Sequence, residues 1–166
     1  MMNDQRFTRE ALSAKGGASL LTYFVEQYTK HCIDRIAQAG LETGWTIPPW
    51  NNLGGYKVGS GKLTPYWRGA IIHKGTWEVI DGERKDVTAA FRAYDSVEDF
   101  FRDQDLLFAN ARYARVRAAK SPSEQANMLQ ACGYATDPEY AGKLVAIIKR
   151  HNLRQYDEEA EVQKHM

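Results

Sequence analysis

Hydrophobic positions along the chain recur mainly at helical spacing. One apolar stripe lies within residues 19–28, and a second lies within residues 33–41. Residues three or four apart share one face of a helix, so each stripe predicts an amphipathic helix. The second helix should end near Gly44, because the Pro48-Pro49 pair that follows cannot continue it.

The middle of the chain changes pattern twice. Residues 46–70 are rich in Gly, Pro, Asn and aromatic side chains, which predicts loops. Two strand-like segments, at 77–80 and 87–91, then flank the turn signal Asp81-Gly82. We therefore expect a short β-hairpin here.

The last third predicts helices with well-marked ends. Ser96 and Ser121 each stand where a side chain would cap the first turn of a helix. Gly133 is a typical residue just beyond a helix end, and Asp137-Pro138 should start the final helix. The predicted fold class is thus mainly α (α+β), with a helical lobe and one small hairpin.

The ends of the chain lack such patterns. Residues 1–17 are polar and end in Gly16-Gly17, so we expect an N-terminal arm. Residues 158–166 are charged and patternless, so we expect a C-terminal tail. No repeat, linker or low-complexity block interrupts residues 18–157, which predicts a single domain between these ends.

Composition excludes some classes of partner. The chain has 166 residues and a net charge of +1, so no bulk charge attracts it to nucleic acid or an anionic membrane. No apolar stretch approaches the roughly 20 residues that span a bilayer. We expect no nucleic-acid partner and no membrane insertion. The four Trp and nine Tyr residues fit either a sugar-binding cleft or an aromatic core.

Cysteine and histidine give no sign of a metal site. Cys32 and Cys132 are far apart and lack metal-ligand spacing, and the four histidines are scattered. Two free thiols are the simpler interpretation, although the fold could bring the two sulfurs together. We expect no metal and no cofactor.

Glu42 is the first residue that indicates chemistry. Glycoside hydrolysis usually needs a carboxylic acid that stays protonated near neutral pH, which requires surroundings poor in water. Glu42 falls in the last turn of a predicted core helix and is followed closely by Trp45. The alternative is an ordinary surface glutamate, but a negative charge at a helix C-terminus is unfavourable, which favours a specific role.

Five segments in order carry a resemblance to a known family. They are Leu41–Trp45 (LETGW), Asn51–Lys57 (NNLGGYK), Phe91–Ser96 (FRAYDS), Arg112–Ala114 (RYA) and Gly133–Leu144 (GYATDPEYAGKL). Together they resemble the glucosaminidase family, glycoside hydrolase family 73, which includes bacterial autolysins, the flagellar peptidoglycan-hydrolase domain and phage lysins. The resemblance spans roughly residues 18–153.

The resemblance implies a lysozyme-like fold in which a helical lobe and a β-hairpin lobe flank a substrate cleft. It implies that residues 18–157 form a catalytic domain. The implied reaction is hydrolysis of the β-1,4 bond between N-acetylglucosamine and N-acetylmuramic acid in peptidoglycan glycan strands, with Glu42 as general acid. Tyr134 would contact substrate, although it could instead be a ring packed between helices. We expect a monomer.

The second carboxylate is less specific. The family often places it on the hairpin in a Thr-x-Glu setting, which Thr76-Trp77-Glu78 matches, so Glu78 is the predicted base or charge stabiliser. Asp81 and Glu83 are rivals on the same hairpin, and any of the three could be merely solvated. The mechanism could be inverting or could use the substrate's acetamido group.

Further substrate-binding residues are expected beside the presumed cleft. They are Trp45, Asn51, Asn52, Tyr56, Tyr66 and Tyr94, and each could equally be loop packing. Two departures from the family lie in the same region. Thr46 replaces a common glycine, and the following loop is short and contains Pro48-Pro49-Trp50.

Other functions remain open at this point. The same fold and acid could serve a muramidase or a lytic transglycosylase, which can work with one carboxyl group. The chain could also be a non-catalytic wall-binding module of a phage tail or secretion machine. Residues 1–6 contain no apolar segment, so we expect no signal peptide. The protein would then be made in the cytoplasm and reach the wall by release or delivery, as a phage lysin does.

Overall fold

The computed structural model describes residues 32–154. The predicted arm (1–17), the predicted helix within 19–28 and the charged tail (158–166) lie outside the described residues. No helix in the described part is long and apolar enough to cross a membrane.

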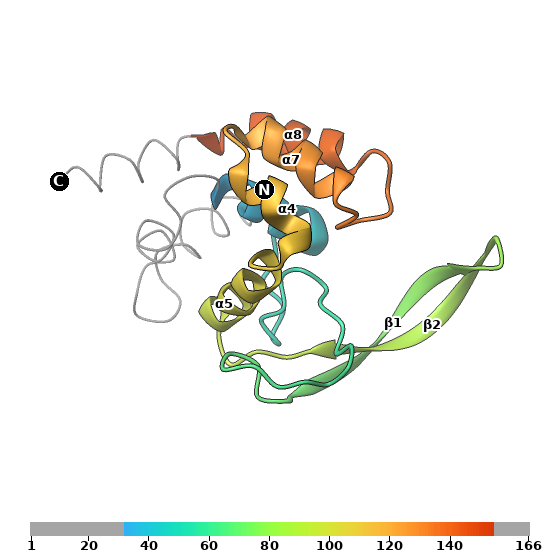
Figure 1. Cartoon of the computed structure of the whole chain (residues 1–166). Helices are drawn as coiled ribbons and strands as arrows, with labels where there is room; N and C mark the ends of the chain where they lie inside the picture. The colour runs from blue at the N-terminus through green and yellow to red at the C-terminus, as the bar shows by residue number, and fades with distance from the viewer. Residues whose placement is uncertain (1–31, 155–166) are drawn as a thin grey trace.

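Helices are the main regular elements of the described chain, and Figure 1 shows α4, α7 and α8 gathered in one lobe from which α5 leads towards the hairpin. Their bounds are α4 Cys32–Thr43, α5 Val97–Phe108, a short 3-10 helix η2 Ala111–Tyr113, α6 Ala114–Ala118, α7 Pro122–Ala131 and α8 Tyr140–Arg150. With one two-stranded sheet, this confirms the predicted mainly-α (α+β) class.

Helix α4 ends where the sequence predicted. The Gly44 amide donates to the carbonyl of Gly40 at 2.9 Å, and Gly44 adopts a φ of 60°, which terminates the helix at low steric cost. The chain then folds Trp45 back against the helix. A Cβ atom at Gly40 would lie 2.5 Å from Cζ2 of Trp45, so only glycine admits the indole there.

The predicted helix caps at Ser96 and Ser121 are confirmed. The Ser96 hydroxyl accepts from the amide of Asp99, and the Ser121 hydroxyl accepts from the amide of Glu124. Gly133 follows α7 with a φ of 76°, as predicted for a residue beyond a helix end.

The predicted start of the last helix was wrong by two residues. Helix α8 begins at Tyr140 instead of Pro138. Asp137 and Pro138 belong to a separate turn, in which the Asp137 carbonyl accepts from the amide of Tyr140 at 3.1 Å. The Asp137 side chain also accepts from the amide of Glu139, and this local bond favours the turn over a first helical turn.

The hairpin is confirmed but is longer than predicted. Strands β1 (Ile71–Ile80) and β2 (Glu83–Arg92) pair antiparallel over ten residues each. Asp81 and Gly82 connect them, both with positive φ, as a tight two-residue hairpin turn requires. The outer parts of the strands are mostly exposed, so they lack the burial alternation that reveals a strand in sequence. Figure 1 shows the hairpin projecting from the rest of the molecule.

The core lies where α4, α5, α7 and α8 meet and continues to the base of the hairpin. Phe100 and Phe101 of α5 are almost fully buried in it, as is Trp67 near the hairpin base. Cys132 is a buried free thiol in this core, whereas the side chain of Cys32 lies outside what the structure describes.

Candidate active site

A cleft of about 990 Å³ lies beside the C-terminal end of α4. Its walls come from that helix end, the loop before the hairpin, the base of β2, the region around the end of α5, and the segment after α7. The lining residues are Glu42, Gly54, Gly55, Tyr56, Lys57, Ser60, Lys62, Leu63, Thr64, Pro65, Arg92, Asp103, Leu106, Leu107, Asn110, Tyr113, Tyr134 and Ala135.

Glu42 points its carboxyl group into this cleft from the last turn of α4. The side chain is accessible to solvent, yet the cleft walls desolvate the carboxyl group enough to raise its pKa above the ordinary value. Gly55 has a φ of 63°, and a Cβ atom there would lie 3.7 Å from Oε2 of Glu42. The loop backbone therefore passes close to the carboxylate, and the raised pKa suits a proton donor.

Tyr134 and Tyr56 meet in the wall of the same cleft. The Tyr134 hydroxyl donates to the Tyr56 hydroxyl at 3.4 Å. Burial, together with the nearby charge of Glu42, raises the pKa of Tyr134 to about 12. Burial and the neighbouring Tyr134 also raise the pKa of Tyr56, so both hydroxyls stay protonated at neutral pH.

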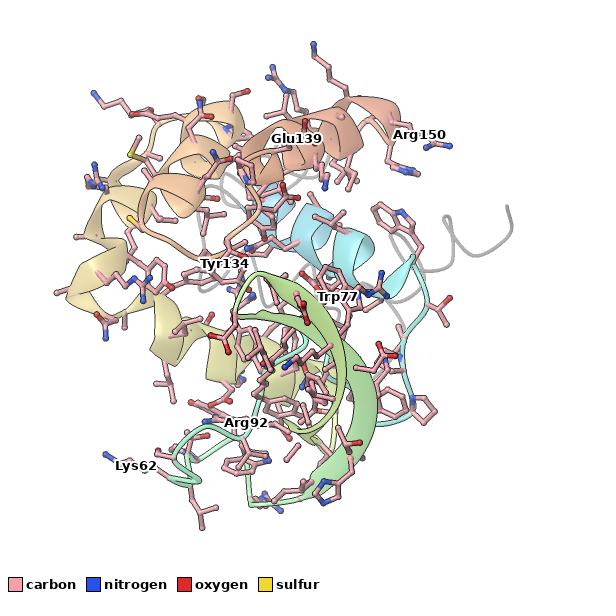
Figure 2. The ribbon with its side chains drawn as sticks, turned by 90° about the vertical axis from the view of Figure 1, so that its right-hand side faces the viewer. Lys62, Trp77, Arg92, Tyr134, Glu139 and Arg150 are labelled. Atoms are coloured by element: carbon pink, nitrogen blue, oxygen red, sulfur yellow. The ribbon has the colours of Figure 1, made fainter. Side chains whose placement is uncertain are left out.

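Tyr134 lines the cleft, and its ring also packs against other aromatic rings. It stacks with Phe108 and with Tyr140, each at 5.8 Å between ring centroids. Figure 2 shows Tyr134 below α7 and α8, on the side of these helices that faces the hairpin. The two interpretations of Tyr134 from sequence are therefore compatible, because the ring packs while the residue also borders the cleft.

Asn52 supports Tyr56 from behind the cleft wall. Its side-chain amide donates to the carbonyls of Tyr56 and Arg92, each at 2.9 Å, and its side-chain oxygen accepts from the amide of Tyr56. Asn51 likewise donates to the carbonyl of Tyr94. These bonds occupy the polar groups of Asn52, so the geometry favours a supporting role over the substrate contact expected from sequence.

The other predicted substrate-binding residues lie outside the cleft lining. Tyr94 is buried, and its hydroxyl donates to Asp103 at 2.5 Å. The Trp45 ring packs 4.4 Å from that of His151. Tyr66 lies beside the guanidinium of Arg102. Of the aromatic residues named from sequence, Tyr56 and Tyr134 are thus the ones that line the cleft.

Asp103 is a cleft residue that the sequence analysis missed. This buried carboxylate of α5 accepts from Thr64 and Arg92, each at 2.8 Å, and from Tyr94. It thereby connects α5 to the preceding loop and to the base of the hairpin. The available signal was its spacing, since Asp103 follows Phe100 by three residues and so falls on the buried stripe of the helix.

Glu78 lies on β1 and reaches the cleft through Lys57. The two side chains form an ion pair, and Lys57 lines the cleft whereas Glu78 does not. Asp81 and Glu83 lie farther along the hairpin, exposed at its turn. Among the three hairpin carboxylates considered, Glu78 is thus the one with a contact to a cleft residue. Within residues 32–154, no group of three or more His, Cys, Asp or Glu side chains could hold a metal ion.

Comparison with known families identifies the family of the chain. Residues 33–153 match the glucosaminidase family, described as mannosyl-glycoprotein endo-beta-N-acetylglucosaminidase. The chain belongs to the glucosaminidase family. The resemblance inferred from the five sequence segments is therefore confirmed.

Named relatives of this glucosaminidase-family chain include a peptidoglycan hydrolase and an exo-glucosaminidase. Peptidoglycan hydrolase FlgJ of Salmonella typhimurium is 41% identical over 119 residues, covering 69% of this chain and 38% of that protein. Exo-glucosaminidase LytG of Bacillus subtilis is 36% identical over 133 residues, covering 74% of this chain and 45% of that protein. The chain thus spans less than half the length of these curated relatives.

Solved structures share the fold. A peptidoglycan hydrolase mutant from Sphingomonas sp. A1 superimposes with a TM-score of 0.72 at 35% identity, covering 92% of this chain and 97% of that one. The catalytic domain of the autolysin Auto from Listeria monocytogenes gives a TM-score of 0.74 at 26% identity, covering 94% and 88%. The predicted fold, with a helical lobe and a small hairpin lobe, is confirmed.

Proposed function

We propose that this glucosaminidase-family chain hydrolyses the β-1,4 bond between N-acetylglucosamine and N-acetylmuramic acid in peptidoglycan, with Glu42 as general acid. The observation that carries the proposal is the Glu42 carboxyl group, whose pKa is raised inside a cleft of about 990 Å³. The names of the relatives support the substrate, since FlgJ is a peptidoglycan hydrolase and LytG a glucosaminidase.

The proposed chemistry begins with proton transfer. Glu42 gives its proton to the glycosidic oxygen while the bond from that oxygen to the anomeric carbon breaks, which leaves positive charge on the sugar ring. A water molecule then attacks the anomeric carbon and loses its proton to a base. The protonated hydroxyls of Tyr134 and Tyr56 supply polar contacts to the sugar at the same wall.

Glu78 is the proposed base or charge stabiliser. Two carboxylates besides Glu42 merit comparison, because Asp103 lines the cleft and Glu78 contacts it through Lys57. Both oxygens of Asp103 already accept hydrogen bonds from protein donors, which leaves little capacity to activate a water molecule. Among the described residues Glu78 has one ion-pair partner, and its side chain is partly exposed, so its carboxylate is available to water.

The direct test is digestion of purified peptidoglycan, with the new reducing ends identified by mass spectrometry. Glu42→Gln should lose about 100-fold or more in rate, because a general acid contributes at least that much. Glu98→Gln is the matched control, since Glu98 lies outside the cleft lining and pairs with Arg102. N-acetylglucosamine ends released by wild type and not by Glu42→Gln support the proposal.

Parallel variants distinguish the roles of the three hairpin carboxylates. Glu78→Gln should lower the rate strongly, whereas Asp81→Asn and Glu83→Gln should leave it within about 2-fold. Loss of activity only in Glu83→Gln or Asp81→Asn would reassign the base. Full activity in all three variants would favour a mechanism with one carboxyl group. In such a mechanism either the substrate's acetamido group participates in hydrolysis, or the enzyme is a transglycosylase that forms anhydro ends.

Other products would change the function. N-acetylmuramic acid reducing ends would identify a muramidase, and anhydro ends a lytic transglycosylase. Binding of peptidoglycan without any release by wild type would identify a non-catalytic wall-binding module.

The setting of the reaction is also part of the proposal. We propose that the chain acts as a monomer on the cell wall, with residues 18–157 as the catalytic domain. Scattering mass measurements during size-exclusion chromatography test the monomer.

A further inference from the structure

A second hollow, of about 430 Å³, lies on the hairpin. Its lining residues are Gly75, Thr76, Trp77, Asp86, Val87 and Thr88, none of which lines the cleft at Glu42. We propose that this hollow binds one N-acetylhexosamine ring of the glycan at a distance from the bond that is cleaved. The proposal rests on the proposed function only in taking the same polymer as ligand.

Strand register places four of the six lining residues on one face, whereas Thr76 and Val87 form the intervening pair, which points to the other face. Gly75 pairs with Thr88, and Trp77 pairs with Asp86. Alternate residues of a strand point to the same face, and directly opposed residues share a face, so these four positions form one block. A Cβ atom at Gly75 would meet no atom of residues 32–154 within 4 Å, so the glycine leaves open space on this face.

Trp77 is arranged as an exposed platform. Its side chain is 53% exposed, whereas Trp67 in the core is 1% exposed. The guanidinium of Arg84 lies over the Trp77 ring, 4.6 Å from its centroid. On the face that carries Trp77, the next pair towards the turn is Val79 with Arg84. The next pair towards the base is Gly75 with Thr88. The ring is therefore supported on the turn side, while the hollow lies on the other side.

The chemistry of these groups fits a neutral pyranose. A flat aromatic ring packs against the C–H face of a sugar. The Asp86 carboxylate accepts hydrogen bonds from sugar hydroxyls, and the Thr88 hydroxyl both donates and accepts. A stem peptide with free carboxylates would meet the negative charge of Asp86, and a hydrocarbon chain would leave Asp86 and Thr88 without partners. A sugar ring uses all three kinds of group.

The test measures binding in the Glu42→Gln background, which keeps the glycan intact. The probe is a preparation of glycan strands freed of stem peptides by amidase digestion, and the readout is the Kd from isothermal titration calorimetry. Trp77→Ala should weaken binding about 10-fold, and Trp77→Tyr should restore most of it because the aromatic face returns. Val79→Ala is the matched control, since Val79 is 65% exposed on the same face but outside the hollow, and it should change Kd less than about 2-fold.

Several outcomes would overturn the proposal. Equal Kd values for Trp77→Ala and its parent would contradict the proposed site. If Val79→Ala weakened binding as much as Trp77→Ala does, the binding would be general apolar adhesion and the proposal would be wrong. Failure of Trp77→Tyr to restore binding would indicate a structural effect of the truncation. Binding of isolated stem peptides instead of glycan strands would assign the hollow to another ligand class.

Failure of this site is distinguishable from failure of the proposed function. Trp77-dependent glycan binding without cleavage by wild type would contradict the hydrolase and leave the hairpin site in place. Cleavage by wild type together with glycan binding that is indifferent to Trp77 would contradict the hairpin site alone.

Discussion

The Tyr134 hydroxyl lies 3.4 Å from the Tyr56 hydroxyl, in the wall of the cleft that Glu42 also lines. The two tyrosines are 78 positions apart in sequence. Tyr134 follows the end of α7, where its amide donates to the carbonyl of Leu129, and Tyr56 is fixed by the amide group of Asn52. Local hydrogen bonds at two distant segments thus determine the geometry of one wall.

Tyr134→Phe should reduce kcat/KM on peptidoglycan by about 10- to 100-fold. The ring packing remains in this variant, but the hydroxyl that contacts Tyr56 and borders the cleft is lost. One hydrogen bond to the charged sugar of the transition state contributes about 1.5–3 kcal/mol. Steady-state kinetics with a dye-labelled peptidoglycan measures the change.

Tyr140→Phe is the control for this variant. Tyr140 is buried outside the cleft lining and accepts a hydrogen bond from Gln38 at 2.9 Å. Its loss should lower the free energy of unfolding by about 1–3 kcal/mol while kcat/KM stays within about 2-fold. An equal loss of activity in both variants would show that Tyr134→Phe acts through stability.

The activity should fall as pH rises through the raised pKa of Glu42. Desolvation in the cleft favours the neutral carboxyl group, and only the protonated form can donate to the glycosidic oxygen. The falling limb of kcat/KM against pH should therefore lie above 4.5, the ordinary value for this group. A limb at or below that value would contradict the assignment of Glu42 as the acid.

The same shift predicts a pH-dependent stability change in Glu42→Gln. Because the folded protein binds this proton more tightly than the unfolded chain, the carboxylate reduces stability as pH rises above the unfolded pKa. Glu42→Gln should accordingly unfold at higher temperature than wild type at pH 7. The difference should shrink as pH falls below 4.5 and vanish near about pH 3, where Glu42 is protonated in both states. Calorimetry at the two pH values measures both.

Lys57→Met should lower kcat while barely changing stability. The pair between Lys57 and Glu78 is about half-exposed, so its loss should cost less than about 1 kcal/mol of unfolding free energy. Glu78 would nevertheless lose its contact with the cleft rim, and about a 10-fold fall in kcat is expected if Glu78 serves the reaction. Lys57→Arg, which can keep the ion pair, should retain most activity. Unchanged kcat in Lys57→Met would argue against a positioning role for Lys57.

Asp103→Ala should destabilise the fold by about 3–5 kcal/mol, because it leaves the Arg92 charge and two hydroxyl groups without their buried partner. Asp95→Ala is the control, since the Asp95 pair with Arg68 is largely exposed and should contribute less than about 1 kcal/mol. Urea unfolding of the two variants compares the contributions. A small effect of Asp103→Ala would show that the network around it is dispensable.

The sequence predicted element ends better than it predicted the roles of loop residues. Gly44, Ser96, Ser121 and the Asp81-Gly82 turn marked boundaries correctly, because each supplies a local backbone conformation or cap that needs no distant partner. Glu42 was placed at its helix end by the same reasoning.

In the segment before the hairpin, the sequence could not show which residues line the cleft and which support its wall. Asn52 and Tyr56 are four positions apart, yet one supports the wall and the other lines it. That difference depends on where β2 and α5 pass, and such distant contacts leave no periodic pattern in the segment itself. Asp103 was missed because a polar residue on an apolar stripe reveals its partners only in the folded protein.

The free projection of the hairpin has a consequence for self-association. Its outer part has unpaired strand edges beside the exposed Trp77, Val79 and Ile80, a combination that favours pairing with a second chain. Residues 83–86 opposite them are Glu, Arg, Lys and Asp, four charged residues in succession. Charged side chains on an edge strand disfavour pairing with a second chain. The charged run therefore lets the hairpin keep apolar side chains open to water without its edges becoming a template for aggregation.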